Sequence, residues 1–208
     1  MSDLPVMLKV EGRRAVVVGG GPTAARRVAT LVECGARVVV IAPQINPTIC
    51  QPQVEIVRRE YRPDDLTGAF LVVVATDDPA VNDVIGRQAA AAGVLVNRAD
   101  EPQEGDFTVM AQGRRGAVTV AVSTGRASAQ AAAAIRDDLL AKLDESWVRL
   151  LSVTAEYRQR LRSADDARKR QSAMRRLTDA SAMAALRSGG EAALRDHCQR
   201  ILEEVGQS

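Results

Sequence analysis

Along the first half of the chain, short apolar runs alternate with longer segments in which apolar residues recur every three or four positions. The apolar runs predict five strands, at residues 15–19, 37–42, 54–61, 69–76 and 93–97. Residues 23–33 and 79–92 are expected to form helices between them. Because apolar strands that alternate with helices are typical of a parallel sheet covered on both faces, we expect an open α/β domain.

The pattern changes after residue 100. Two strand-like runs, 107–111 and 117–123, are joined by a glycine-containing connection, which predicts an antiparallel hairpin. From Ser128 onward the residues favour helices, with a break at Ser188-Gly189-Gly190. The apolar hairpin strand and the Ala-rich helix after it lack a cover of their own, which predicts a homodimer. The expected parts are a parallel-sheet domain over 1–113, a hairpin-and-helix dimerisation region over 114–145 and a helical C-terminal domain over 146–208.

Composition limits the classes of function. The 208 residues carry a net charge of +2 and only 2% aromatic residues, which argues against a nucleic-acid-binding surface. The N-terminal segment lacks the apolar core of a signal peptide, and no later apolar run approaches transmembrane length. We therefore expect a cytoplasmic protein without membrane contact. Three widely spaced cysteines and a single histidine form no metal-binding motif, so no metal ligand is predicted.

Residues 19–24 read Gly-Gly-Gly-Pro-Thr-Ala and fit the G-x-G-x-x-G/A pattern, directly after the first predicted strand and at the start of the first helix. The glycines permit a tight turn and the close approach of a pyrophosphate to backbone N–H groups, and small Ala24 allows helix and strand to pack closely. The pattern predicts a Rossmann-like dinucleotide-binding domain. The alternative is a turn with a structural role alone.

The second predicted strand ends in Ile41-Ala42-Pro43-Gln44, without the acid that usually holds the ribose of NAD. No acid occurs between Glu33 and Glu55, but no arginine or lysine occurs between Arg37 and Arg58 either. Nothing in this stretch would neutralise the additional 2′-phosphate of NADP. The sequence therefore favours NAD, held at the ribose by backbone groups or by Gln44.

Polar residues follow the fourth and fifth predicted strands. Asp78 is expected to cap the following helix, and Asn82 on that helix is a candidate to face the site. Asn97, Arg98 and Asp100 lie at the carboxyl edge of the sheet, where ligands of open α/β sheets bind. A carboxylate there can act as a general base, although Asp before Pro102 also suits a turn.

Four stretches in the same order resemble the precorrin-2 dehydrogenase/sirohydrochlorin ferrochelatase family, which includes the N-terminal module of siroheme synthases. They are LPVMLKVEGRRAVVVGGGPTAARR, VVATDDPAVN, VNRADEPQEGDF and RRGAVTVAVSTGRASAQAAAAIRDDL. The resemblance implies an NAD-dependent dehydrogenase that converts precorrin-2 to sirohydrochlorin, with ferrous iron insertion as a second activity in some members. Alternatives are a dinucleotide-sensing module without catalysis and a chelatase that has lost its redox step.

The resemblance also implies roles for individual residues. The family's N-x-x-D pattern falls on Asn97 to Asp100, which makes Asp100 the expected catalytic carboxylate. Replacing Asp100 with alanine is expected to keep the fold. The cofactor-binding candidates are Gly19, Gly20, Gly21, Pro22, Thr23, Ala24, Pro43, Gln44, Thr76, Asp77 and Asn97. The substrate-binding candidates, chosen because the acetate and propionate arms need cationic and polar partners, are Arg98, Arg114, Arg115, Ser123, Thr124, Arg126 and Ser128.

Three residues depart from the family pattern. Met110 stands where a proline is usual, Arg126 replaces the second glycine of a Ser-Thr-Gly-Gly turn, and Ala129 replaces the proline after Ser128. A large cation at Arg126 would either bind a substrate carboxylate or narrow the cleft. These departures place iron insertion in more doubt than dehydrogenation.

Overall fold

The structure, a computed structural model, describes residues 3–162 and 166–206 and divides into two compact units, Met1–Val109 and Met110–Ser208. The division after Val109 precedes the boundary expected at residue 113, because the hairpin strand that begins at Ala111 pairs within the second unit. The assignment of 114–145 to dimerisation stays a prediction.

The first unit is built on a five-stranded parallel sheet in the order β3-β2-β1-β4-β5. All five strands predicted from the apolar runs are present. Their bounds are β1 Arg14–Val18, β2 Arg37–Ile41, β3 Val54–Val57, β4 Leu71–Val74 and β5 Leu95–Arg98. Strand β3 ends earlier than expected, because the chain turns after Val57, where the N–H of Arg59 donates back to the Val57 carbonyl.

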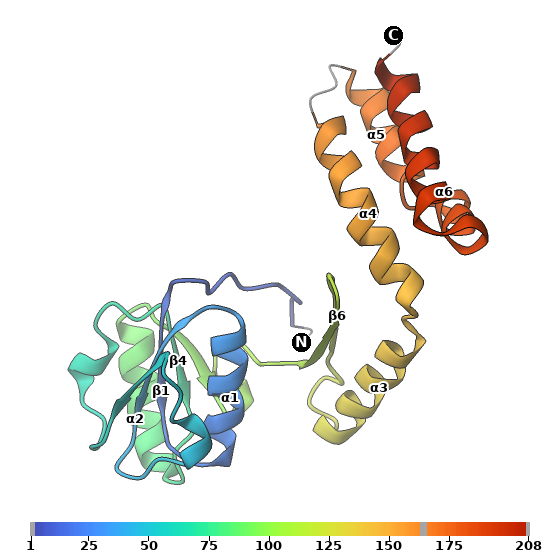
Figure 1. The fold of residues 1–208 in the computed structure, drawn as a ribbon. Coiled ribbons are helices and arrows are strands. Elements are labelled where there is room, and N and C mark those ends of the chain that lie inside the picture. The colour runs from blue at the N-terminus through green and yellow to red at the C-terminus, as the bar shows by residue number, and fades with distance from the viewer. Residues whose placement is uncertain (1–2, 163–165, 207–208) are drawn as a thin grey trace. The chain divides into compact units, whose positions relative to one another are not determined.

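Two helices cover the two faces of this sheet (Figure 1). Alternate residues of β1 point to opposite sides, so Ala15 and Val17 pack with Val28 of α1 (Pro22–Glu33). Val16 and Val18 pack on the other face with Ile85 of α2 (Pro79–Ala91). Since both faces are buried, the strands are apolar at nearly every position, as the sequence pattern indicated.

Short 3₁₀ turns connect the remaining elements: η1 Pro47–Ile49, η2 Pro63–Leu66 and η3 Pro102–Glu104. After η3 the chain returns to the sheet, where the N–H groups of Asp106 and Phe107 donate to the Val96 carbonyl at 2.8 and 3.3 Å. The Asp106 carboxylate accepts in turn from the Val96 N–H at 2.9 Å. These contacts tie residues 106 and 107 to β5, so the strand expected at 107–111 does not form there.

The hairpin instead consists of β6 (Ala111–Arg115) and β7 (Val118–Val122), paired antiparallel with Arg115 opposite Val118. The two-residue loop starts with Gly116 at φ +56°, a conformation that favours glycine. Helix α3 (Ala129–Lys142) lies so close to β6 that a Cβ atom on Gly113 would come within 2.4 Å of Leu140. The hairpin is therefore present as predicted, but its first strand begins four residues later.

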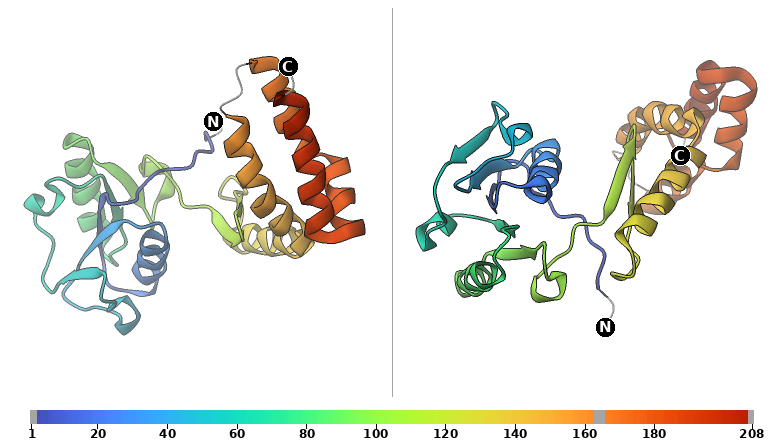
Figure 2. Two further views of the ribbon diagram at one scale, coloured as in Figure 1. Left: turned by 45° about the horizontal axis from the view of Figure 1, so that its top comes forward. Right: turned by 90° about the horizontal axis from the view of Figure 1, so that it is seen from below.

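Three further helices, α4 (Glu145–Leu161), α5 (Ala167–Arg176) and α6 (Ala180–Gly206), pack side by side in the second unit (Figures 1 and 2). Their shared core includes Leu150, Leu177 and Leu194. Helix α6 is interrupted at Gly190, at φ +68°, within the break expected from Ser188-Gly189-Gly190. The helical C-terminal part is thus confirmed. Within the described part of the chain, no helix is long and apolar enough to cross a membrane.

Candidate functional site

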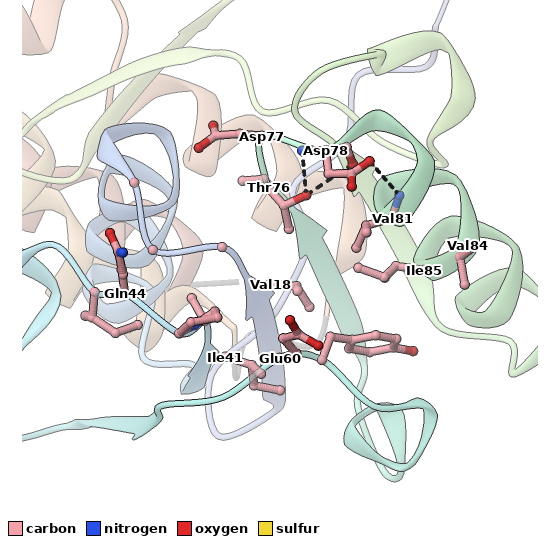
Figure 3. Close-up of a pocket in the computed structure, with 18 of the residues that line it drawn as sticks. Val18, Ile41, Gln44, Glu60, Thr76, Asp77, Asp78, Val81, Val84 and Ile85 are labelled. Atoms are coloured by element: carbon pink, nitrogen blue, oxygen red, sulfur yellow. Dashed lines mark hydrogen bonds between the residues drawn. The ribbon is translucent and has the colours of Figure 1, made fainter.

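A cavity of about 1130 Å³ opens at the carboxyl ends of the parallel strands (Figure 3). It is lined by the segments that follow β1, β2 and β4, by Glu60 and Tyr61 after β3, and by one face of α2. Strand β1 lies between β2 and β4 in the sheet, so the chain leaves β1 and its neighbours in different directions. This is the switch point at which open α/β sheets bind ligands.

The glycine turn has one member that the fold itself does not require. A Cβ atom added to Gly19 would lie 2.1 Å from the Ala75 carbonyl oxygen, and one added to Gly20 would lie 1.9 Å from the Gln44 carbonyl oxygen. Packing alone therefore demands glycine at both positions. On Gly21 the Cβ atom would meet no atom within 4 Å, and its backbone (φ −81°, ψ −172°) suits any residue. The bare backbone at Gly21 leaves room for a ligand.

Gly21 is also the N-cap of α1, and no side chain caps this helix. The first turn of α1 contains no acidic residue. The N–H groups at a helix N-terminus carry a partial positive charge and favour anions. The turn therefore fits the pyrophosphate of a dinucleotide, with the backbone of residues 20 and 21 as the surface it approaches.

The charges around the cavity are all of one sign. Its lining residues include Glu60, Asp77 and Asp78 but no arginine, lysine or histidine. Of the sequence candidates, Pro43, Gln44, Thr76 and Asp77 line the cavity together with the three glycines. Glu60 was not among the sequence candidates, because it follows β3 and the ribose-binding acid of this fold is expected after β2. The pairing of β3 with β2 carries Glu60 to the same sheet edge, and strand pairing could have indicated it.

A chain of hydrogen bonds leads from this cavity to Asp100. Thr76 Oγ1 donates to Asn82 Oδ1 at 2.6 Å, and Asn82 Nδ2 donates to Asp100 Oδ2 at 2.9 Å. Asn82 is only 1% exposed, so its amide is held between the two partners. Asp78 caps α2, as expected, by accepting from the N–H groups of Ala80 and Val81. The end of β4, the start of α2 and the loop after β5 form one connected network.

Asp100 is paired with a buried arginine. Arg98 donates from Nε to Asp100 Oδ1 and from Nη2 to Asp100 Oδ2, both at 2.9 Å, and from Nη1 to Asp83 Oδ1 at 2.9 Å. These hydrogen bonds hold the pKa of the Asp100 carboxyl far below its usual range, with the Asn82 hydrogen bond adding to the effect. Arg98 was expected to bind substrate, but the residue is only 3% exposed and its guanidinium donates to Asp100 and Asp83 inside the protein.

Three cofactor candidates near the turn and one within β5 lie outside the cavity lining. Pro22, Thr23 and Ala24 form the first turn of α1, where Ala24 is fully buried against the sheet. Asn97 is 2% exposed, and its Nδ2 donates to the Phe107 carbonyl at 2.8 Å. The structure therefore places Asn97 in the interior, where it ties β5 to the segment after η3.

The remaining substrate candidates belong to the second unit. Thr124 Oγ1 donates to the Ser128 carbonyl at 2.9 Å, and Ser128 caps α3 by accepting from the Ala131 N–H at 3.1 Å. Arg115 donates to the Leu143 carbonyl. These three side chains hold the local fold. Arg126 and Ser123 are exposed between β7 and α3, and Arg114 is exposed on β6.

Arg126 has an unusual backbone. It adopts φ +72° and is the one non-glycine residue with a positive φ in the parts of the chain that the structure describes. The turn thus keeps the conformation that suits the glycine of the family pattern although the side chain is arginine. No group of three or more His, Cys, Asp or Glu side chains in the described ranges could hold a metal ion.

The parallel sheet, the glycine turn and the acidic cavity define a dinucleotide-binding α/β protein. Residues 6–111 match the family described as "Putative NAD(P)-binding". The precorrin-2 dehydrogenase of Priestia megaterium is 36% identical over 157 residues, 74% of this chain and 77% of that protein. The chain therefore belongs to the NAD(P)-binding family that contains the precorrin-2 dehydrogenases.

Two further comparisons agree with this family. The siroheme synthase of Nitrosococcus oceani is 36% identical over 166 residues, which cover 78% of this chain but only 36% of that protein. The chain thus spans about a third of the length of the siroheme synthases it matches. The solved structure of SirC, a precorrin-2 dehydrogenase, superposes with a TM-score of 0.76 at 28% identity and covers 97% of this chain and all of that one.

Proposed function

We propose that this protein catalyses the NAD-dependent dehydrogenation of precorrin-2 to sirohydrochlorin. The observation that carries the proposal is the cavity at the carboxyl edge of the sheet, whose glycine turn leaves Gly21 open to a pyrophosphate. The connection of this cavity to Asp100 through Thr76 and Asn82 adds a catalytic carboxylate. The substrate is that of the precorrin-2 dehydrogenases to which this chain is similar.

NAD, when bound, supplies the acceptor for the hydride. The residues after β1, β2 and β4 bind and orient the dinucleotide, and the apolar face of α2 with Val81 and Val84 covers it. Both valines are exposed in the structure, at 39% and 42%, although they line the cavity. A bound planar group would remove them from water, which favours binding.

Asp100 acts as a fixed negative charge. The substrate loses a hydride and, to solvent water, a proton in the reaction, and positive charge develops on the macrocycle as the hydride leaves. An ionised carboxylate that is already oriented stabilises that charge. Because the Arg98 pair strongly lowers its pKa, Asp100 is a poor proton acceptor at neutral pH. We therefore assign Asp100 an electrostatic role, in place of the general-base role expected from the sequence.

The acidic arms of the substrate require cations. Arg126 and Arg114, both exposed, are the candidates that remain after Arg98 and Arg115 are assigned to internal contacts. Iron insertion is not part of this proposal, since no observation in the described residues favours it over dehydrogenation. We also propose the cytoplasmic location that the sequence leads us to expect.

The proposal includes a homodimer. Ile135 and Leu139, four residues apart on one face of α3, are 46% and 42% exposed, and Trp147 on α4 is 39% exposed. A second copy would cover such apolar side chains. Light scattering at micromolar concentration should give twice the 22.2 kDa chain mass, and a monomer would contradict the dimer.

The dehydrogenase proposal is tested with the purified protein, precorrin-2 and NAD, without added metal. The absorbance of sirohydrochlorin should rise in proportion to the NADH formed. If NAD binds in a separate titration but no sirohydrochlorin forms, the dinucleotide-sensing alternative replaces the enzyme. If the chain neither binds NAD nor forms product, the assignment of the cavity as a dinucleotide-binding site is wrong.

A further inference from the structure

The end of β2 lacks the acid that usually holds the ribose of NAD, yet the cavity contains one nearby. We propose that Glu60, in the loop after β3, is the residue that selects NAD over NADP: its carboxylate accepts hydrogen bonds from the adenosine ribose and repels a 2′-phosphate. This inference rests on the dinucleotide-binding part of the proposed function.

Strand pairing places Glu60 beside the ribose end of the cavity. Val57 is the partner of Ile41, and the pairing continues with the Ala42 N–H, which donates to the Val57 carbonyl at 3.2 Å. Glu60 follows three residues later and lines the same cavity as Pro43 and Gln44. Figure 3 shows its side chain among the lining residues, in the region of Ile41 and Val18. In this class of fold the ribose binds at the end of β2.

The other two acids of the cavity are less suited to this role. Asp78 accepts from two N–H groups of α2 and is occupied as a helix cap. Asp77 and Asp78 both follow β4, which lies on the opposite side of β1 from β2. The carboxylate of Glu60, by contrast, takes part in none of the hydrogen bonds or ion pairs found among residues 3–162 and 166–206. Its acceptor atoms are available for a ligand.

The nearest basic side chain in sequence, Arg59, is engaged by another acid and does not line the cavity. Arg59 forms a two-point ion pair with Asp65, with Nη2 at 2.6 Å from Oδ1 and Nη1 at 2.8 Å from Oδ2. The hydrogen bonds from Arg59 lower the pKa of the Asp65 carboxyl, which keeps the pair charged. Arg59 does not line the cavity. Arg59 Nη1 also donates to the backbone carbonyl of Glu60 at 2.9 Å, but its ion pair is with Asp65 and not with the Glu60 carboxylate. Among the residues that line the cavity, no cation neutralises Glu60.

Charge decides between the two dinucleotides at this position. The ribose of NAD offers two hydroxyl donors to a carboxylate, and such charge-assisted hydrogen bonds are stronger than neutral ones. NADP replaces one hydroxyl with a phosphate, so like charges meet at Glu60. Because Glu60 is exposed, solvent screens part of this repulsion. Substituting glutamine for Glu60 keeps the size and an acceptor but removes the repulsion.

Calorimetric titration of NAD and NADP into the full chain tests the proposal. The wild type should prefer NAD by about tenfold or more, and E60Q should reduce the ratio to within about threefold. E60R should reverse it by supplying a cation for the 2′-phosphate. The matched control is E55Q, an exposed acid on β3 that does not line the cavity, and it should keep the wild-type ratio.

A second variant separates Glu60 from Gln44. If Gln44 or backbone groups hold the ribose without Glu60, Q44A should weaken NAD binding while E60Q leaves the ratio of the two affinities unchanged, which would overturn the proposal. Binding is measured without precorrin-2, so loss of dehydrogenation does not affect the result. A wild type that binds neither dinucleotide would overturn both this proposal and the proposed function. A thermal melt of E60Q close to wild type excludes misfolding.

Discussion

Arg98 and Asp100 form a parallel two-point ion pair at the end of β5, with both N–O distances at 2.9 Å. Arg98 is almost completely buried, whereas 26% of the Asp100 side chain is exposed. The arginine therefore acts as an internal support, and the carboxylate is the part of the pair that can meet a ligand. A rigid orientation of this kind is what an electrostatic catalytic role requires.

The pair changes what replacing Asp100 should do. From the sequence alone, Asp100→Ala is expected to keep the fold at little cost. In the structure it leaves the buried Arg98 guanidinium with only exposed Asp83 as a carboxylate partner. We now expect both alanine and asparagine at this position to lower the free energy of unfolding, by about 2–3 kcal/mol for alanine.

Measuring turnover together with stability separates a catalytic role of Asp100 from a purely structural one. Turnover per folded molecule should fall about 10²-fold or more in Asp100→Asn, because the fixed negative charge is lost. Calorimetric unfolding and the sirohydrochlorin assay on the same preparation measure both effects. Asp64→Asn, an exposed acid in η2, is the control and should match the wild type in both. Wild-type turnover in folded Asp100→Asn would contradict a catalytic role.

Stability should depend on pH through the same carboxyl. Its pKa is lowered in the folded state, so the stabilisation is fully present above the unfolded pKa of about 4 and is lost as the pH falls below it. The melting temperature of the first unit should drop between about pH 4 and pH 2.5, and Asp100→Asn should reduce that drop. Circular dichroism melts over this range, at constant ionic strength, measure the difference; equal slopes for both proteins would contradict the lowered pKa.

Gly21 offers a substitution that should separate binding from folding. Gly21 is the N-cap of α1, where aspartate is a favoured capping residue, and the added Cβ atom would meet no protein atom within 4 Å. We expect Gly21→Asp to keep or slightly raise the melting temperature while it abolishes NAD binding, because the carboxylate occupies the pyrophosphate position. Gly20→Ala is the contrasting variant: its Cβ would lie 1.9 Å from the Gln44 carbonyl, so it should destabilise the fold.

The parallel sheet was predictable because its strands are apolar on both faces. This pattern can be recognised in the sequence without knowing which strands are neighbours. The acid that lines the ribose end was not predictable, since Glu60 reaches the cavity through the pairing of β3 with β2. The position of Asp100 was predictable from the strand end, but the strong lowering of its pKa was not. The lowered pKa depends on a buried arginine two residues away and on Asn82 from another element.

The hairpin shows a different limit. Residues 107–111 have the apolar pattern of a strand, but Phe107 is tied to the Val96 carbonyl, and pairing with β7 starts only at Ala111. The local sequence pattern indicates that a strand forms, but tertiary contacts determine its register. Here the short loop at Gly116 and the packing of α3 against Gly113 set that register.

Arg126 provides a test in the second unit. Its positive φ is a conformation that glycine adopts without strain, and relief of that strain should make Arg126→Gly more stable by about 1 kcal/mol. Trp147, the single tryptophan, lies on α4 and reports the unfolding of this unit by fluorescence in urea. Arg149→Gly, on the same helix as Trp147, removes an arginine from a helical position and should lower stability by about 1 kcal/mol.

If Arg126 binds a carboxylate arm of precorrin-2, the stabilised Arg126→Gly protein should show a KM for precorrin-2 raised about tenfold with an unchanged affinity for NAD. An unchanged KM in a stabilised protein would show that the arginine is tolerated in the turn without a substrate contact, and an unchanged stability would contradict the strain.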